Sequence, residues 1–257
     1  MVLFRGRFPS LVLGRNMYFS VLLPRAQSLY QDVSTSMVLG GKKVLWFFHG
    51  VGDDADTVLL HTDMADLCDA HDLIVILPCM ENGFTLDVSE NLRYRSYLTE
   101  ELFPYVTGIF GLSTQREQQL IGGISMGGYG ACSIGLQMPE RFGRIFCLSG
   151  ALDLRMAARF SRACGIHLAS ELVERRATEL HPDWDVYALL ERLAGMASPP
   201  PLWLVCSEVD AVFKSNLLLA ERGAALGLPV ELHRAPGLHD WRFWRENLPA
   251  ALDWAMQ

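Results

Sequence analysis

The segment that most restricts the fold runs from Leu120 to Ala131 and reads LIGGISMGGYGA. Its apolar start predicts a buried strand that ends in glycines around Ser125. Residues 126–138 then predict a helix that stops before Pro139. This order matches the G-x-S-x-G pattern, in which a serine occupies a sharp turn between a strand and a helix. The glycines are needed because the two backbones pass too close for a Cβ atom, and the turn itself is strained.

Such a turn has a chemical consequence for the serine that it carries. It exposes the hydroxyl of Ser125 and leaves the next backbone amide, on Met126, free to point toward a negatively charged oxygen. The N-terminus of the following helix adds a partial positive charge at the same place. We therefore predict that Ser125 is a nucleophile, provided that the chain also supplies a base and an acid.

Short apolar runs alternate with helical stretches along most of the 257 residues. Alternation of this kind predicts an α/β fold with a mostly parallel sheet and helices on both faces. We expect a single domain over 1–257, in which a mostly helical excursion at about 151–198 forms a cap-like insertion near the substrate. We also expect an early edge strand over 17–23 paired with 3–8, helices at 57–71 and 96–110, and a kink at Pro249.

A serine hydroxyl needs a base to remove its proton, usually a histidine that is oriented by a carboxylate. In parallel sheets, ligands bind at the carboxyl ends of the strands. His239 lies in a glycine-containing loop after the last predicted strand, so it is the favoured base. His49 lies at the same edge but precedes the serine. The other histidines fall in a strand, on helices or in the excursion: His61, His71, His167, His181 and His233.

Asp210 is the favoured acid because it follows the predicted strand 202–206 at its carboxyl end. The resulting chain order of serine, aspartate and histidine is that of the α/β-hydrolases. Asp153 is the main rival and could instead line the pocket. Weaker rivals are the adjacent Glu208 and two residues of the excursion, Asp183 and Asp185.

Composition excludes several other classes of protein. The net charge of −7 and the lack of a basic stripe argue against nucleic-acid binding. The 6 cysteines form no C-x-x-C pair, so they are expected to be reduced core residues of a cytoplasmic protein. Neither a signal peptide nor a membrane-spanning run is apparent. Acids at 53, 54 and 56 precede a helix and are read as capping residues, so no metal site is expected.

Several segments together carry a resemblance to a known family: 48–51, 123–131, 138–142, 149–153, 206–210 and 237–241. On these motifs the chain resembles the esterase D and tributyrin-esterase branch of the α/β-hydrolase superfamily. That branch includes acetyl and feruloyl esterases, S-formylglutathione hydrolases and mycolyltransferases. The segments span nearly the whole chain.

The resemblance implies a cofactor-free serine carboxylesterase that acts on small acyl esters, either short aliphatic or of acetyl or feruloyl type. It implies Ser125 as nucleophile, His239 as base and Asp210 as the group that orients the base. Val51 and Met126 are the implied backbone donors to the oxyanion. The expected pocket residues are His49, Gly50, Tyr129, Asp153 and Trp241. The implied partner is a small-molecule ester, and a homo-oligomer is possible.

Three places distinguish the chain within this branch. The turn around Ser125, called the elbow below, typically reads Gly-His-Ser-Met-Gly-Gly-His-Gly in S-formylglutathione hydrolases. This chain has Ile124 and Tyr129 in place of the two histidines. The family's frequent Gly-Thr-Glu-Asp is Ser-Glu-Val-Asp at 207–210 here. The motifs favour a tributyrin- or feruloyl-type esterase over a thioesterase or an acyltransferase. The alternative of a different class is a noncatalytic binding protein on the same fold.

Overall fold

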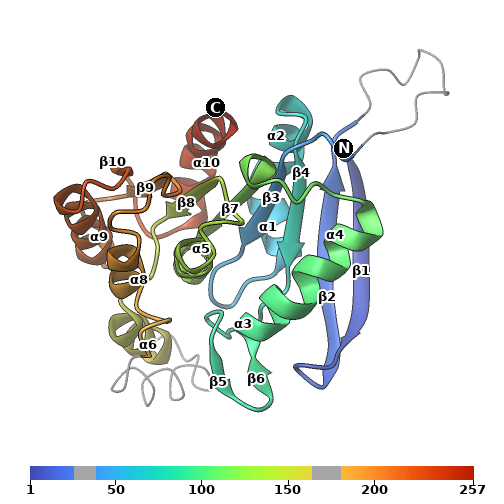
Figure 1. The fold of residues 1–257 in the computed structure, drawn as a ribbon, viewed down its shortest axis with the longest axis horizontal. Coiled ribbons are helices and arrows are strands. Elements are labelled where there is room, and N and C mark those ends of the chain that lie inside the picture. The colour runs from blue at the N-terminus through green and yellow to red at the C-terminus, as the bar shows by residue number, and fades with distance from the viewer. Residues whose placement is uncertain (26–38, 164–180) are drawn as a thin grey trace.

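A computed structural model of the chain describes residues 1–25, 39–163 and 181–257. The described elements build an eight-stranded sheet in the order β1-β2-β4-β3-β7-β8-β9-β10 (Figure 1). Six neighbouring strands run parallel: β4, β3, β7, β8, β9 and β10. Strand β2 pairs antiparallel with β4. This confirms the predicted mostly parallel sheet. The strand bounds are β1 Val2–Ser10, β2 Arg15–Leu23, β3 Val44–Phe48, β4 Ile74–Pro78, β7 Gln119–Ile124, β8 Arg144–Leu148, β9 Leu202–Cys206 and β10 Val230–Arg234.

Helices cover both faces of the sheet because its central strands are apolar on both sides. In β3, for example, Trp46 packs into one core and Phe47 into the other. Full burial of such a side chain stabilises the fold by about 1.5–3 kcal/mol. One face carries α1 (Ala55–His61), α2 (Met64–Ala70) and α10 (Trp241–Met256).

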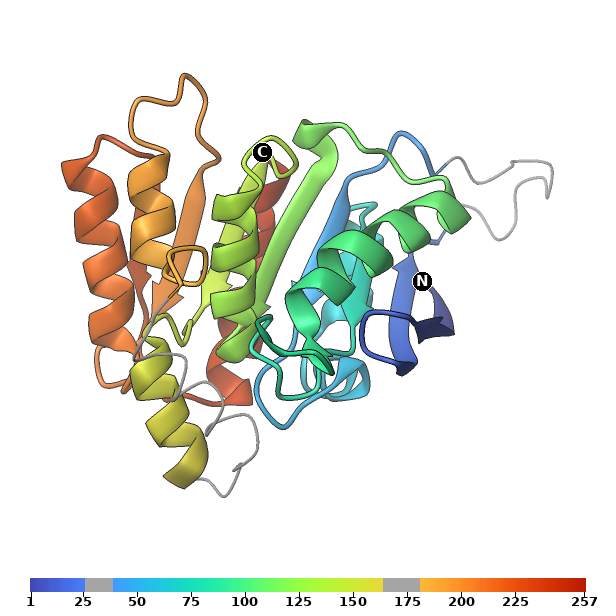
Figure 2. The same cartoon turned by 60° about the horizontal axis from the view of Figure 1, so that its bottom comes forward.

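The opposite face carries a row of helices that Figure 2 shows side by side in front of the sheet. They are α3 (Tyr94–Ser96), η1 (Tyr97–Leu102), α4 (Phe103–Phe110), α5 (Met126–Gln137), α8 (Val186–Arg192) and α9 (Phe213–Ala225). A short helix, η2 (Arg116–Gln118), precedes β7, and a separate hairpin joins β5 (Asp87–Ser89) to β6 (Leu92–Arg93).

Several boundaries differ from the predictions. The strand at 17–23 does pair with the N-terminal strand, but it lies between β1 and β4, so β1 is the edge strand. The helix expected at 57–71 is divided at Thr62, whose hydroxyl donates to the Val58 carbonyl. The helix expected at 96–110 contains a π-helical turn, η1. Helix α10 continues through Pro249, and the kink expected there stays a prediction.

The excursion at 151–198 contains α6 (Leu154–Ala163) and α8, which agrees with its predicted helical character. His167 and Cys164 lie outside the described residues, and the cap-like role of the excursion stays a prediction.

In the part of the chain that the structure describes, no helix is long and apolar enough to cross a membrane. That part also holds no cluster of metal-ligating side chains. Asp54 caps α1 by accepting from the Thr57 amide.

Candidate active site

Ser125 occupies the turn between β7 and α5 in a backbone conformation that is rare for a side-chain-bearing residue. Its φ is 51° and its ψ is −115°. Backbone hydrogen bonds hold it there: its amide donates to the Leu148 carbonyl at 3.0 Å, and its carbonyl accepts from Ala151 at 3.0 Å and from Tyr129 at 3.1 Å. The surrounding structure thus maintains a strained turn, as expected for a functional residue.

The glycines of the elbow are explained by backbone contacts. A Cβ atom on Gly127 would lie 2.2 Å from the Phe48 carbonyl oxygen, and one on Gly123 would lie 2.5 Å from the Gly127 carbonyl carbon. Neither contact can be relieved by moving a flexible side chain. The close approach of β3, β7 and α5 therefore requires glycine at both positions.

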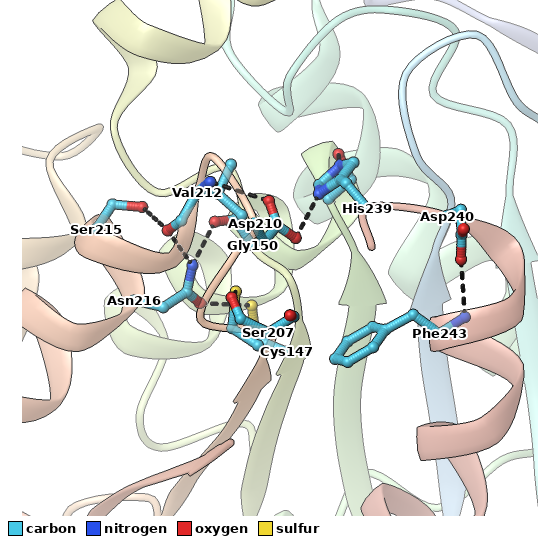
Figure 3. Close-up of polar contacts among 12 residues, drawn as sticks. Cys147, Gly150, Ser207, Asp210, Val212, Ser215, Asn216, His239, Asp240 and Phe243 are labelled. Atoms are coloured by element: carbon cyan, nitrogen blue, oxygen red, sulfur yellow. Dashed lines mark hydrogen bonds and ion pairs between the residues drawn. The ribbon is translucent and has the colours of Figure 1, made fainter. Parts of the chain in front are cut away.

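The structure brings the three predicted triad residues together. The Nε2 atom of His239 lies 2.9 Å from Ser125 Oγ, and its Nδ1 atom lies 2.8 Å from Asp210 Oδ2. Figure 3 shows the Asp210 carboxylate facing the imidazole of His239. An ionised carboxylate only accepts hydrogen bonds, so Nδ1 carries the proton and Nε2 accepts from the serine hydroxyl. This tautomer is the one that a general base requires.

The electrostatic environment keeps Asp210 ionised. Its side chain has no exposed surface, and this burial raises the pKa of the carboxyl. The hydrogen bond and the charge of His239, together with the Val212 amide 3.0 Å from Oδ1, outweigh burial and lower the pKa below its ordinary value. At neutral pH the carboxylate is therefore available to stabilise an imidazolium at His239.

The loop that carries His239 is anchored to α10. The Asp240 carboxylate caps that helix by accepting from the Phe243 amide at 3.0 Å, as Figure 3 shows. The Trp244 ring stands perpendicular to the His239 ring, with centroids 5.1 Å apart. These contacts hold the loop and the ring of His239 in place and leave its Nε2 atom facing Ser125.

The two predicted oxyanion donors lie beside the nucleophile. Met126 is the first residue of α5, and Val51 lines the cavity that contains Ser125. Among the described residues, neither backbone amide donates a hydrogen bond to another protein group. Both are thus available to a ligand, although their role remains a prediction.

An apolar cavity of about 60 Å³ opens at Ser125 and His239. Its walls combine segments that are far apart in the sequence. Besides Ser125, Asp210 and His239 it is lined by Val51, Phe84, Ala151, Met156, Ala157, Ala211 and Val212. Apart from the triad, these residues bring no charged side chain to the cavity, so it suits an uncharged, nonpolar group.

None of the five residues expected in the pocket lines this cavity. His49 is buried in the loop after β3 that carries Val51, where its Nδ1–H donates to the Gly50 carbonyl at 2.8 Å. Its Nε2 accepts from the Met80 amide at 3.0 Å, and burial lowers its pKa. His49 therefore positions the loop. A Cβ on Gly50 would lie 2.9 Å from Asp53 Oδ2 and 3.7 Å from Ser125 Cβ, so this glycine lies beside the nucleophile but is not among the residues that line the cavity.

The other three expected pocket residues are held elsewhere. Tyr129 is buried and donates its hydroxyl to the Trp184 carbonyl at 2.8 Å. Asp153 is exposed and accepts from the Arg155 and Met156 amides in the first turn of α6. Trp241 stacks on His61, with ring centroids 5.1 Å apart.

The rival acids and bases also have other partners. Glu208 pairs with Arg234, Asp183 pairs with Arg192, and Asp185 caps α8. His233 stacks on Trp203, and His71 and His181 lie beside surface aspartates. Among the described candidates, His239 and Asp210 are the pair that reaches Ser125.

Sequence reasoning missed most of the cavity wall. Ala211 and Val212 follow Asp210 directly, so adjacency to the acid could have indicated them. Phe84 and Met156 carry no comparable signal, because a loop phenylalanine and a helical methionine are ordinary packing residues. Phe84 reaches the cavity through a φ of 50°, which the sequence does not reveal.

Comparisons with known proteins find a matching family model, a similar relative and similar structures. The family model described as "Putative esterase" matches residues 10–255. An acetyl esterase of Caldicellulosiruptor saccharolyticus is 28% identical over 99% of this chain and 98% of its own length. An S-formylglutathione hydrolase of Staphylococcus aureus superposes with a TM-score of 0.85 at 24% identity, covering 100% of this chain and 99% of that one. A ferulic acid esterase superposes with a TM-score of 0.75 at 19% identity, covering 99% and 98%. The two structural likenesses concern the fold.

Proposed function

Because the chain belongs to this esterase family, an α/β-hydrolase branch, we propose that it is a serine carboxylesterase that hydrolyses small acyl esters through an acyl-enzyme on Ser125. The observation that carries the proposal is the continuous hydrogen-bond path from Asp210 through His239 to Ser125. A noncatalytic binding protein would have no need of a buried carboxylate, an oriented imidazole and a strained serine in one line.

The first half of the reaction forms the acyl-enzyme. His239 Nε2 takes the proton of Ser125 as the serine oxygen attacks the ester carbonyl. The negative charge of Asp210 stabilises the imidazolium. His239 then gives the proton to the departing alcohol. Water repeats the sequence on the acyl-enzyme and releases the acid, with no cofactor required.

The tetrahedral intermediate carries a negative oxygen that must be stabilised. We assign this role to the Val51 and Met126 amides. The start of α5 adds its partial positive charge at Met126. Loss of one such donor typically costs about 3 kcal/mol of barrier. His49 supports this arrangement indirectly by fixing the Gly50 carbonyl.

The cavity favours short aliphatic acyl groups over aromatic ones. An apolar cavity of about 150 Å³ accommodates benzene. The cavity beside Ser125 measures about 60 Å³ and is open to solvent on one side, so it suits a short acyl chain such as acetyl better than the bulky feruloyl group. The name of the acetyl esterase relative is consistent with this choice. We therefore expect acetyl and butyryl esters to be better substrates than octanoyl or feruloyl esters.

We also propose a cytoplasmic location and a small-molecule ester as the partner. The location is supported by cysteines without disulfides at positions 68, 79, 132, 147 and 206. A homo-oligomer remains a prediction from the resemblance.

The test is a set of initial rates on p-nitrophenyl acetate, butyrate, octanoate and feruloyl esters and on an acetyl thioester. Wild type is compared with Ser125→Ala and with a matched control, Ser198→Ala, which removes an exposed hydroxyl. We expect the control to match wild type and Ser125→Ala to lose several orders of magnitude. Equal rates for Ser125→Ala and wild type would contradict the proposal. A preference for the thioester would favour the S-formylglutathione hydrolase-like alternative.

A further inference from the structure

A buried amide side chain joins the two loops that support the triad. Asn216, in the first turn of α9, is fully buried. Its Nδ2 donates to the Gly150 carbonyl at 2.8 Å and to the Val212 carbonyl at 2.9 Å, so both of its hydrogens are used. Its Oδ1 lies 4.0 Å from Cys147 Sγ. Figure 3 shows Asn216 pointing between these loops, on the side of Asp210 away from His239.

One end of this link reaches the acid. The amide of Val212 donates to Asp210 Oδ1 at 3.0 Å, which leaves Oδ2 for His239. The Val212 carbonyl lies on the next peptide group, so holding that carbonyl restricts the Val212 backbone and with it the direction of the Asp210 carboxylate. The carbonyl of Val212 also accepts from Ser215 Oγ at 2.7 Å, so this end has support besides Asn216.

The other end reaches the nucleophile. Gly150 follows β8, and the next amide, on Ala151, donates to the Ser125 carbonyl at 3.0 Å. A Cβ on Gly128 of α5 would lie 3.0 Å from Gly150 Cα, so the backbone at Gly150 packs directly on the helix that follows Ser125. Gly150 is thus bound on one side to the nucleophile's turn and on the other to Asn216.

A buried amide is a costly choice if the position only has to fill space. Burying it without hydrogen bonds destabilises the fold, and with them the net gain in stability is small. An aliphatic residue of similar volume would serve a purely packing role. An amide differs from an aliphatic side chain because its two N–H donors lie in one rigid plane. They therefore fix the distance between the Gly150 and Val212 carbonyls.

We propose that Asn216 is a positioning residue for catalysis, which keeps the Asp210 loop in register with the turn of Ser125. The inference rests on the proposed esterase function. Its bond to Val212 helps to orient the acid. Its bond to Gly150 fixes the position of that acid relative to the nucleophile. The cross-loop bond to Gly150 is the part that Ser215 cannot replace.

The experiment measures kcat and KM on p-nitrophenyl acetate for Asn216→Ala, Asn216→Ser and Ser215→Ala. Ser215→Ala is the matched control, because it removes a bond to Val212 but none to Gly150. A misplacement of about 1 Å can cost about 100-fold in rate. We expect Asn216→Ala to lower kcat by up to that factor with KM nearly unchanged, Asn216→Ser to fall between it and wild type, and Ser215→Ala to stay near wild type.

A double-mutant cycle with Asp210→Asn separates positioning from general destabilisation. If Asn216 acts through Asp210, Asn216→Ala costs little further in the Asp210→Asn background. An equal loss in both backgrounds, or an unchanged kcat in the single variants, would overturn the inference. Asn216→Ser provides the same cycle if the alanine variant does not fold. Ser125→Ala in the same assay tests the proposed function itself: if it is as active as wild type, that function fails, whereas an inactive Ser125→Ala beside a fully active Asn216→Ala rejects the positioning role alone.

Discussion

The nucleophile and its acid–base partners are positioned in different ways. The turn of Ser125 depends on glycines at 123 and 127, which let β3, β7 and α5 approach each other, and on backbone hydrogen bonds to Leu148 and Ala151. Asp210 and His239 lie on loops after β9 and β10, and their support comes from α9, α10 and the loop after β8. The turn of the nucleophile thus depends on close backbone contacts that a side chain at 123 or 127 would prevent. The positions of the acid and the base depend instead on side chains from distant segments.

This difference predicts how each region responds to substitution. At the elbow an added atom meets backbone, which cannot move without displacing a strand. On the acid–base side a substitution removes one contact among several. We expect changes at the triad atoms to be severe, changes at the elbow to affect activity and folding together, and changes in the cavity wall to be graded.

The largest effect is expected for Asp210→Asn. The amide keeps the shape but has no negative charge to stabilise the imidazolium, and it can favour the wrong tautomer of His239. A corresponding change in a serine protease triad lowers kcat about ten-thousand-fold. Steady-state rates on p-nitrophenyl acetate would measure this. Glu208→Gln, at an exposed acid paired with Arg234, is the control and should change the rate little. A loss below tenfold for Asp210→Asn would transfer the role of the acid to another residue.

Gly127→Ala tests whether the elbow depends on the close approach of the backbones. The new Cβ would lie 2.2 Å from the Phe48 carbonyl oxygen. Overpacking of this kind typically costs about 1–3 kcal/mol of stability, and here it also moves Ser125 away from His239. We expect a loss of activity of about 100-fold or more and a lower melting temperature. Gly41→Ala, where nothing lies within 4 Å of the added atom, should leave both unchanged. Equal behaviour of the two variants would contradict this account of the elbow.

A smaller, selective effect is expected at the cavity wall. Met156→Ala removes a half-buried side chain that lines the cavity, so longer acyl chains gain room. An added methylene in an apolar pocket is worth about 1–3 kcal/mol, or at least tenfold in specificity. The octanoate-to-acetate ratio of kcat/KM should therefore rise by about tenfold or more. Met196→Ala, at an exposed methionine outside the wall, should keep the wild-type ratio. An unchanged ratio in Met156→Ala would place the acyl group elsewhere.

The smallest effect concerns His49 and pH. Its pKa is lowered by burial, and protonation of Nε2 would break the bond from Met80. The unfolded chain therefore binds a proton more readily, so this contribution to stability is complete above the ordinary pKa of 6.5 and is lost as pH falls below it. The loss can reach about 1.4 kcal/mol per pH unit. Urea unfolding at pH 7.5 and 5.5 should show a larger decrease for wild type than for His49→Gln. Equal decreases would show that folding does not lower the pKa of His49.

The sequence predicts best where local chemistry determines structure. The elbow, the mostly parallel sheet and the meeting of strand ends follow from glycine spacing and apolar runs, so Ser125, Asp210 and His239 could be selected before their distances were known. Phe84, Met156 and Asn216 could not, because their positions depend on how distant segments pack. His49 and Asp153 lie at the predicted edge of the sheet, but they do not line the cavity because their hydrogen bonds turn them toward the backbone.

The measurement that tests the central claim most directly is the identification of the acylated residue. Wild type and Ser125→Ala would be mixed with p-nitrophenyl acetate, quenched rapidly in acid and digested, and the peptides would be weighed by mass spectrometry. We predict one acetyl group on the peptide that contains Ser125 in wild type, and none at that position in the variant. An acetyl group that forms at another side chain at the rate of turnover, or turnover that persists in Ser125→Ala, would contradict the assignment of Ser125 as the nucleophile.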